Sequence, residues 1–204
     1  MTFRDRLERI EGDGRARRVV TAGGLALGCD LVLLGLGVEP ATGFLAGSGI
    51  VVDDGVLVDE RCRTNVEGVF AAGDVARHRH PLFGPVRVEH WQNARAQGRA
   101  AALSMLGRGQ PYADVHWFWS EQYDHRLEYA GWHVGWDELV VRGSLEERRF
   151  VVFYLAEGRV RAVAALDRGN EVRAAMALIA AGGRADPASL RDEDVDLARL
   201  APAG

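Results

Sequence analysis

The sequence contains no lysine. All 25 of its basic residues are arginine, against 29 acidic residues, which gives a formal net charge of -4. Because charges of both signs are spread along the whole chain, no strong field favours a polyanion or an anionic membrane. We therefore expect neither nucleic acid nor a membrane surface as a partner.

Cysteine is scarce as well. Only Cys29 and Cys62 are present, far apart and without a C-x-x-C pattern. Zinc, iron–sulfur and dithiol chemistry all lack their usual ligand spacing here, so we expect no metal site. A reduced, cytoplasmic setting fits this cysteine usage.

Long apolar runs are also missing. The main ones, Leu31–Leu36 and Ala174–Ala181, are far too short to span a bilayer, and the first residues do not open a signal peptide. What the chain does have is 204 residues with 48% hydrophobic content, which is enough to bury a core. We expect a soluble protein with one large domain or two small ones.

The first part of the chain has a strand-like pattern. Residues 15–37 predict two short strands turning at Ala22–Gly24, followed by a continuous apolar strand over Asp30–Gly37. Such a run is typical of a central strand covered on both faces of an α/β sheet. Few elements that could cover it lie upstream, so we expect the chain to begin in the middle of a domain.

The next part alternates short strands with one helix. The pattern predicts strands at Ile50–Val52, Val56–Val58 and Val69–Ala72, then a helix within Val88–Leu106 that breakers end at Gly107–Pro111. The polar repeat from His78 to Pro81 predicts a loop. His-x-His can bind a metal, but arginines interleave with these histidines and no further ligands lie nearby.

After residue 111 the pattern of β-rich stretches followed by two helices is typical of a small α+β domain. We expect an antiparallel meander followed by a helix capped by Asn170 and a second helix starting at Asp186-Pro187. The acidic run Asp192–Asp194 is too short to be a charge block and indicates solvated surface. The expected strands of the meander are Leu127–Val134, Glu138–Arg142, Arg149–Leu155 and Val160–Asp167.

The most informative stretch is the segment from Thr64 to Ala76. A buried strand would deliver Gly73, which has no side chain to keep a ligand away, and then Asp74, whose carboxylate accepts hydrogen bonds from hydroxyls. A glycine–aspartate pair alone would be read as an ordinary turn. The whole run, T-N-V-E-G-V-F-A-A-G-D, is more specific.

This run resembles that of flavoproteins with two dinucleotide-binding domains, where a T-x-x-x-x-x-[YF]-A-x-G-D segment places its aspartate on the ribityl chain of FAD. The stretches V-E-H-W-Q-N-A-R-A-Q-G from Val88 and W-F-W-S-E-Q-Y from Trp117 narrow the resemblance to the ferredoxin, rubredoxin and putidaredoxin reductases. That family usually has aspartate where this chain has Glu121. The resemblance covers nearly the whole chain.

The resemblance implies a set of residues that contact the cofactor. Free N–H groups at the start of the helix near His90 could face the electron-rich edge of a flavin. Trp117 and Trp119 point to the same side of an extended segment, where they could seal two domains together, line the route to an electron acceptor or shield the flavin ring; the resemblance favours shielding. We predict no catalytic residue, and we predict FAD contacts from Gly73, Asp74, Glu89, His90, Trp91, Trp117 and Trp119.

No G-x-G-x-x-G occurs in the chain, although the family uses one for FAD and another for the nicotinamide. The resemblance therefore implies an α/β remnant of a two-dinucleotide-domain flavoprotein plus a C-terminal α+β reductase domain. Residues 1–37 would end the NAD(P)-binding domain, residues 38–110 would form the second FAD segment, and residues 111–204 the C-terminal domain.

The parent enzyme would pass electrons from NAD(P)H through FAD to an iron–sulfur or rubredoxin-type acceptor. This chain would need an N-terminal half as partner, and a homodimer is possible. One alternative is a non-catalytic remnant that serves dimerisation or docking. Another is a disulfide- or peroxide-reducing flavoenzyme, which the absence of a redox-active cysteine pattern disfavours.

Overall fold

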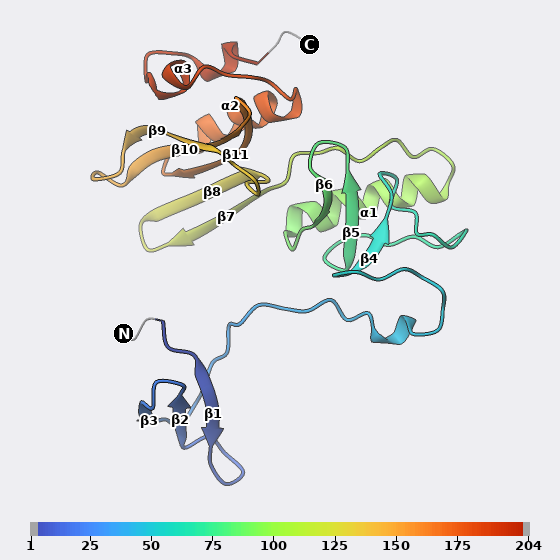
Figure 1. The fold of residues 1–204 in the computed structure, drawn as a ribbon, viewed down its shortest axis with the longest axis vertical. Helices are drawn as coiled ribbons and strands as arrows, with labels where there is room; N and C mark the ends of the chain where they lie inside the picture. The colour runs from blue at the N-terminus through green and yellow to red at the C-terminus, as the bar shows by residue number, and fades with distance from the viewer. Residues whose placement is uncertain (1–3, 202–204) are drawn as a thin grey trace. The chain divides into compact units, whose positions relative to one another are not determined.

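The computed structural model describes residues 4–201 and separates the chain into two compact units, Met1–Glu39 and Pro40–Gly204. Figure 1 shows a small sheet in the first unit, and two sheets with their helices in the second. The fold mixes helices and sheets, as predicted. Every helix among residues 4–201 is too short or too polar to cross a lipid bilayer.

The first unit is a three-stranded antiparallel sheet with its strands in chain order. The predicted turn at Ala22–Gly24 is confirmed, and Gly24 adopts a φ of +83° there, which favours glycine. The first strand is rich in charged residues and had no strand signal in the sequence. The strands are β1 (Leu7–Glu11), β2 (Arg18–Thr21) and β3 (Ala26–Gly28).

The predicted central strand over Asp30–Gly37 is wrong for this structure. The segment is irregular, and the side chains of Leu31, Leu33 and Leu36 are 84%, 93% and 78% exposed. No strand among the described residues pairs with it, so its main-chain groups have no ladder and its side chains no cover. Each large apolar side chain left in water forgoes about 1.5–3 kcal/mol.

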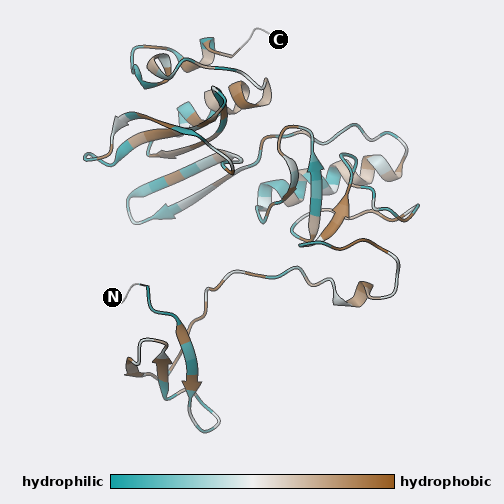
Figure 2. Cartoon of the chain, in the orientation of Figure 1, coloured by the Kyte–Doolittle hydropathy of each residue, from teal (hydrophilic) through white to brown (hydrophobic). Residues whose placement is uncertain are grey.

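The second unit begins with a mixed three-stranded sheet in which β5 pairs parallel to β4 and antiparallel to β6. The predicted loop around His78 is wrong, because His78 and His80 lie on β5 with their side chains buried. Figure 2 shows the contrast between the apolar β4 and the polar β5. The strands are β4 (Val56–Val58), β5 (Ala76–His80) and β6 (Gly84–Arg87).

Two other predicted strands of this region are also wrong. Ile50–Val52 and Val69–Ala72 contribute only single bridges, from Val52 to Val56 and from Phe70 to Arg63. The predicted helix is confirmed as α1 (Trp91–Met105), and a short helical turn, η1 (Gly43–Leu45), precedes β4. The buried face of α1 repeats every fourth residue and consists of Asn93, Gln97 and Ala101.

The rest of the second unit is a five-stranded antiparallel sheet in the order β7-β8-β11-β10-β9. The predicted meander is wrong in one respect, because β8 pairs with β11 and not with β9. Local hairpin signals cannot reveal this pairing of strands distant in sequence. The strands are β7 (Trp117–Gln122), β8 (His125–Gly131), β9 (Glu138–Ser144), β10 (Arg149–Ala156) and β11 (Arg159–Leu166).

One face of this sheet packs against α2 (Gly169–Ala180) to form the main core, which includes Phe153 and Leu178. The N-cap of α2 is Arg168, so the predicted cap at Asn170 is wrong. The cap predicted for α3 (Pro187–Arg191) is confirmed, because Asp186 accepts hydrogen bonds from the first N–H groups of that helix. A last helical turn, η2 (Leu197–Arg199), also packs against α2.

Candidate functional site

Gly73 and Asp74 lie directly before β5. Gly73 is buried with a φ of +79°, and its N–H donates a 2.7 Å hydrogen bond to the Gln97 side chain on α1. A side chain at residue 73 would be strained by that φ. Asp74 is exposed, so its carboxylate faces outward from a backbone that α1 holds in place.

Arg87 connects Asp74 to Glu89. The largely buried guanidinium donates to the main-chain oxygen of Asp74 at 3.3 Å and to a carboxylate oxygen of Glu89 at 2.5 Å. It also pairs with Asp54 at 3.1 Å. The turn at Asp74 before β5 and the segment leading into α1 are therefore tied together by one arginine.

His90 is the N-cap residue of α1, and its side chain makes no capping hydrogen bond. The positive end of the helix dipole is thus left open to a group outside the helix. The His90 ring packs against Phe118 at a centroid distance of 4.6 Å. Burial lowers the pKa of His90, and the nearby carboxylates of Asp74 and Glu89 oppose that effect.

Trp91 is the first residue of α1 and is 69% exposed. The guanidinium of Arg95, one turn later, lies 5.6 Å from the centre of its ring. Trp91 and Arg95 line a cleft of about 430 Å³ along α1 together with Arg99, Leu103 and Tyr112. The start of α1 therefore carries an aromatic and basic surface.

Trp117 and Trp119 point to the same side of β7, as the alternation predicted. Their rings stack with centroids 4.9 Å apart and planes inclined by 28°. Trp117 packs against the main core, and Trp119 is 42% exposed with Arg126 over its ring. Phe118 between them points to the opposite face, toward His90.

The structure thus brings Gly73, Asp74, Glu89 and His90 together at the start of α1, and places the two tryptophans on the far face of the neighbouring edge strand. The sequence interpretation missed Gln97, Arg87 and Phe118. A signal existed for Gln97, because Asn93 and Gln97 occupy the buried spacing of α1. No local signal identified Arg87.

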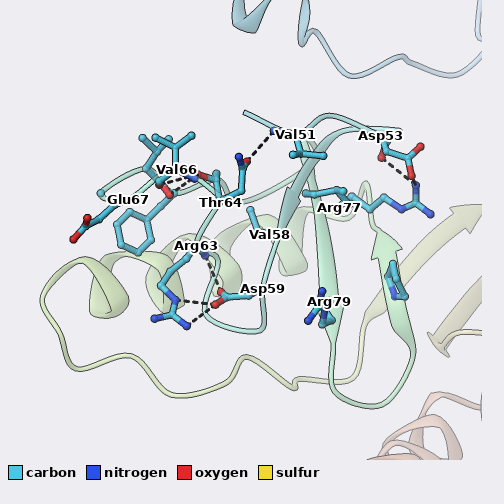
Figure 3. A pocket seen from close by; sticks show the side chains of 16 residues that line it. Val51, Asp53, Val58, Asp59, Arg63, Thr64, Val66, Glu67, Arg77 and Arg79 are labelled. Atoms are coloured by element: carbon cyan, nitrogen blue, oxygen red, sulfur yellow. Dashed lines mark hydrogen bonds and ion pairs between the residues drawn. The ribbon is translucent and has the colours of Figure 1, made fainter. Parts of the chain in front are cut away.

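A cavity of about 750 Å³ lies on the outer face of β4 and β5 (Figure 3). It borders the loop around Thr64 and Glu67, but none of the seven predicted flavin-contact residues lines it. Two of its arginines are paired, Arg63 with Asp59 and Arg77 with Asp53. Its charges are therefore largely balanced by its own walls.

A cluster of buried histidines lies where β5 meets the segment before β7. The ring of His80 lies 5.6 Å from that of His78 and 4.8 Å from that of His116. His80 accepts a hydrogen bond from the N–H of Leu82, so its other ring nitrogen donates to the oxygen of Asp114. Burial lowers the pKa of His80 to about 4 and that of His116 to about 3, and it lowers the pKa of His78 as well.

These histidines predict sensitivity to mild acid. The folded-state pKa values of His80 and His116 lie below the ordinary value of 6.5. At mildly acidic pH these histidines therefore bind protons in the unfolded chain but stay neutral in the folded chain. The contribution of His80 to the free energy of unfolding is fully present above pH 6.5 and is lost as the pH falls toward about 4. We expect the urea midpoint of the second unit to fall between pH 7 and pH 5. His116→Phe should reduce this fall, because it removes one of the groups whose pKa burial lowers.

Two family models match the chain. The pyridine nucleotide-disulphide oxidoreductase model matches residues 1–98, and the reductase C-terminal model matches residues 117–201. The ferredoxin–NAD(+) reductase component of the anthranilate 1,2-dioxygenase system of Burkholderia cepacia is 42% identical over 82% of this chain and 42% of its own length. Putidaredoxin reductase of Pseudomonas putida is 34% identical over 89% of this chain and 43% of its own length.

Solved structures agree with these matches. The covalent putidaredoxin reductase–putidaredoxin complex superposes with a TM-score of 0.90 at 32% identity, covering 98% of this chain and 50% of that chain. A ferredoxin reductase from Rhodopseudomonas palustris gives a TM-score of 0.88 at 33% identity, covering 97% and 49%. The chain spans about half the length of the relatives it matches.

Proposed function

We propose that the chain forms part of a flavin-dependent reductase of the pyridine nucleotide-disulphide oxidoreductase family, because the model of that family and the reductase C-terminal model match residues 1–98 and 117–201. The whole enzyme would pass electrons from NAD(P)H through FAD to a ferredoxin- or rubredoxin-type acceptor. The observation that carries this proposal is the uncapped start of α1 beside the exposed carboxylate of Asp74 and the buried Gly73.

The residues at this point fit a flavin. Gly73 presents main chain without a side chain, and Asp74 offers a carboxylate that can accept hydrogen bonds from the ribityl hydroxyls. The N–H groups of the first turn of α1 are suited to the electron-rich edge of the ring. FAD would supply the redox chemistry, taking a hydride and releasing single electrons. The chain's own residues would orient it and exclude water.

We propose three roles along the chain. Residues 1–37 would complete a NAD(P)-binding domain, residues 38–110 would supply the second segment of the FAD domain, and residues 111–204 would be the C-terminal reductase domain. The two family models and the division between Glu39 and Pro40 support this arrangement.

The FAD pyrophosphate requires a glycine-rich loop, and these 204 residues contain no G-x-G-x-x-G. We therefore propose an N-terminal half of the reductase as a partner that supplies it. The exposed apolar run Leu31–Leu36 supports a missing neighbour, since sheet partners would cover it. The alternative is that a second copy of the chain covers Leu31–Leu36.

An acidic electron acceptor would dock beside the start of α1. Arg95 and Arg99 line the cleft next to Trp91, and neither forms an ion pair among the described residues. Such a basic and aromatic surface suits an acidic partner, because complementary charge steers association. The names of two relatives, a ferredoxin–NAD(+) reductase component and putidaredoxin reductase, support an acceptor of the ferredoxin type.

Reconstitution tests the proposal. We expect the purified chain to pass through gel filtration without bound flavin, and to bind it stoichiometrically when mixed with an N-terminal half from a related reductase. The N-terminal half alone is the control. A flavin spectrum retained by the chain alone would show that the partner is unnecessary. Association of the halves without flavin binding would favour a docking module without catalysis, and sedimentation would detect a homodimer.

A further inference from the structure

Tyr129 and His133 form a hydrogen-bonded pair on the face of the C-terminal sheet opposite α2. The phenol oxygen of Tyr129 lies 2.8 Å from Nδ1 of His133, and the main-chain N–H of His133 donates to the same oxygen at 3.1 Å. In the tautomer that carries its hydrogen on Nε2, His133 offers Nδ1 as an acceptor, and the phenol donates its proton to it.

This geometry joins an oxidisable phenol to a base. Tyr129 is half-buried, and burial raises its pKa to about 12, so the phenol keeps its proton at neutral pH. A phenol that loses an electron becomes a strong acid, and its oxidation is therefore fastest where a base already holds the proton by a short hydrogen bond. The 2.8 Å contact lies within the range required for such a transfer.

We propose that Tyr129 is a redox-active tyrosine with His133 as its proton acceptor. The electron goes to a one-electron oxidant of the peroxyl-radical class, and the phenolic proton goes to Nδ1 of His133. The products are a neutral tyrosyl radical, an imidazolium and a hydroperoxide anion, which takes a proton from water. The phenol O–H bond breaks in the electron-transfer step, and a water O–H bond breaks when the hydroperoxide anion takes its proton, which leaves hydroxide.

A series of rings extends from this pair in both directions. Phe118 lies 5.4 Å from Tyr129 and 4.6 Å from His90 at the start of α1. On the other side, Tyr154 lies 5.4 Å from His133 and 6.2 Å from Trp136. The pair therefore sits between the proposed flavin-facing helix and an exposed tryptophan. Its own chemistry does not require a flavin.

Two other tyrosines, Tyr123 and Tyr112, provide internal controls. Tyr123 is fully exposed at the tip of the β7–β8 hairpin, and Tyr112 is buried and donates to the Asn93 side chain at 3.1 Å. Among the described residues, only Tyr129 is hydrogen-bonded to an imidazole. Oxidation governed by exposure would select Tyr123, whereas oxidation governed by the base selects Tyr129.

Flash oxidation of the purified chain with a photogenerated ruthenium(III) complex tests this choice. Transient absorption and electron paramagnetic resonance would report the tyrosyl radical in wild type, Tyr129→Phe, Tyr123→Phe and His133→Phe. We expect Tyr129→Phe to remove most of the early signal and Tyr123→Phe to leave it. His133→Phe keeps a ring in place but removes the base, so radical formation should slow by at least about tenfold.

Circular dichroism establishes that each variant is folded. A signal that disappears in Tyr123→Phe and persists in Tyr129→Phe would overturn the proposal, as would an unchanged rate in His133→Phe. Because the chain is tested without flavin, these results are independent of the reconstitution experiment. Failure here would leave the proposed reductase function intact.

Discussion

Replacing Arg142 with alanine will lower the free energy of unfolding of the C-terminal domain by about 3–5 kcal/mol, as expected when one member of a buried ionic network is removed. Arg142 lies on β9 with only 4% of its surface exposed. It donates to a carboxylate oxygen of Glu171 at 2.8 Å and to the main-chain oxygens of Val195 at 2.9 Å and Glu193 at 3.2 Å.

The loss would be large because several acceptors are left without a donor at once. Main-chain oxygens of Leu190 and Asp192 also accept from Arg142. An unsatisfied buried acceptor costs about 1–3 kcal/mol, and Glu171 would retain a charge only partly compensated by Arg168. The segment after α3 would lose the side chain that holds it against β9.

Urea denaturation followed by tryptophan fluorescence would measure this change. Arg142→Lys keeps the charge but not the planar fork, so it should recover only part of the stability. Arg173→Ala, at an exposed arginine on α2, is the matched control and should shift stability by no more than about 0.5 kcal/mol. A loss below about 1 kcal/mol in Arg142→Ala would show that water replaces the guanidinium.

This network illustrates what the sequence could not show. The run Asp192–Asp194 indicated a solvated acidic surface, and the side chain of Asp194 fits that interpretation. The contacts that Asp192 and Glu193 make with Arg142 use their main-chain oxygens, which any residue would present. A pattern of side chains carries no information about such acceptors, and a buried arginine in an alternating strand cannot be told from an exposed one.

Elements with strong local signals were predicted correctly. The helix at Trp91 and the cap at Asp186 depend on residues within one turn, and the Ala22–Gly24 turn depends on two glycines. Strands depend on a neighbour. Asp30–Gly37 and Val69–Ala72 have the composition of strands, but among the described residues the first has no pairing partner and the second has only the single bridge from Phe70 to Arg63, which is why neither forms a strand.

The residues of the candidate site also fall into those that local sequence predicted and those that depend on packing. The sequence run predicted that Gly73 and Asp74 lie together, and the helix prediction placed His90 at its start. The contacts that join these parts come from Arg87 and Gln97, whose roles depend on packing between β6, α1 and the turn before β5. The motif thus predicted which residues would face a ligand, and the residues that support them required the structure.

Asp74→Asn, in the chain reconstituted with an N-terminal half, should weaken FAD binding by about 1.5–3 kcal/mol, the range for hydrogen bonds to a charged group. Asp74 is exposed and its side chain supports no other described contact, so folding should be unaffected. Flavin titration by fluorescence would measure the affinity. Asp124→Asn, at the exposed tip of the β7–β8 hairpin, is the matched control and should leave it unchanged.

Trp119→Ala should give a different phenotype in the same assay. This substitution removes the ring that stacks on Trp117 but no hydrogen bond to the flavin, so FAD should stay bound. The fluorescence of the bound FAD should change, and the reduced flavin should react faster with dissolved oxygen, because an aromatic screen is gone. Trp136→Ala is the matched control, because Trp136 is 46% exposed against 42% for Trp119. If Asp74→Asn leaves affinity unchanged, or if both tryptophan variants behave alike, these positions are structural and the flavin lies elsewhere.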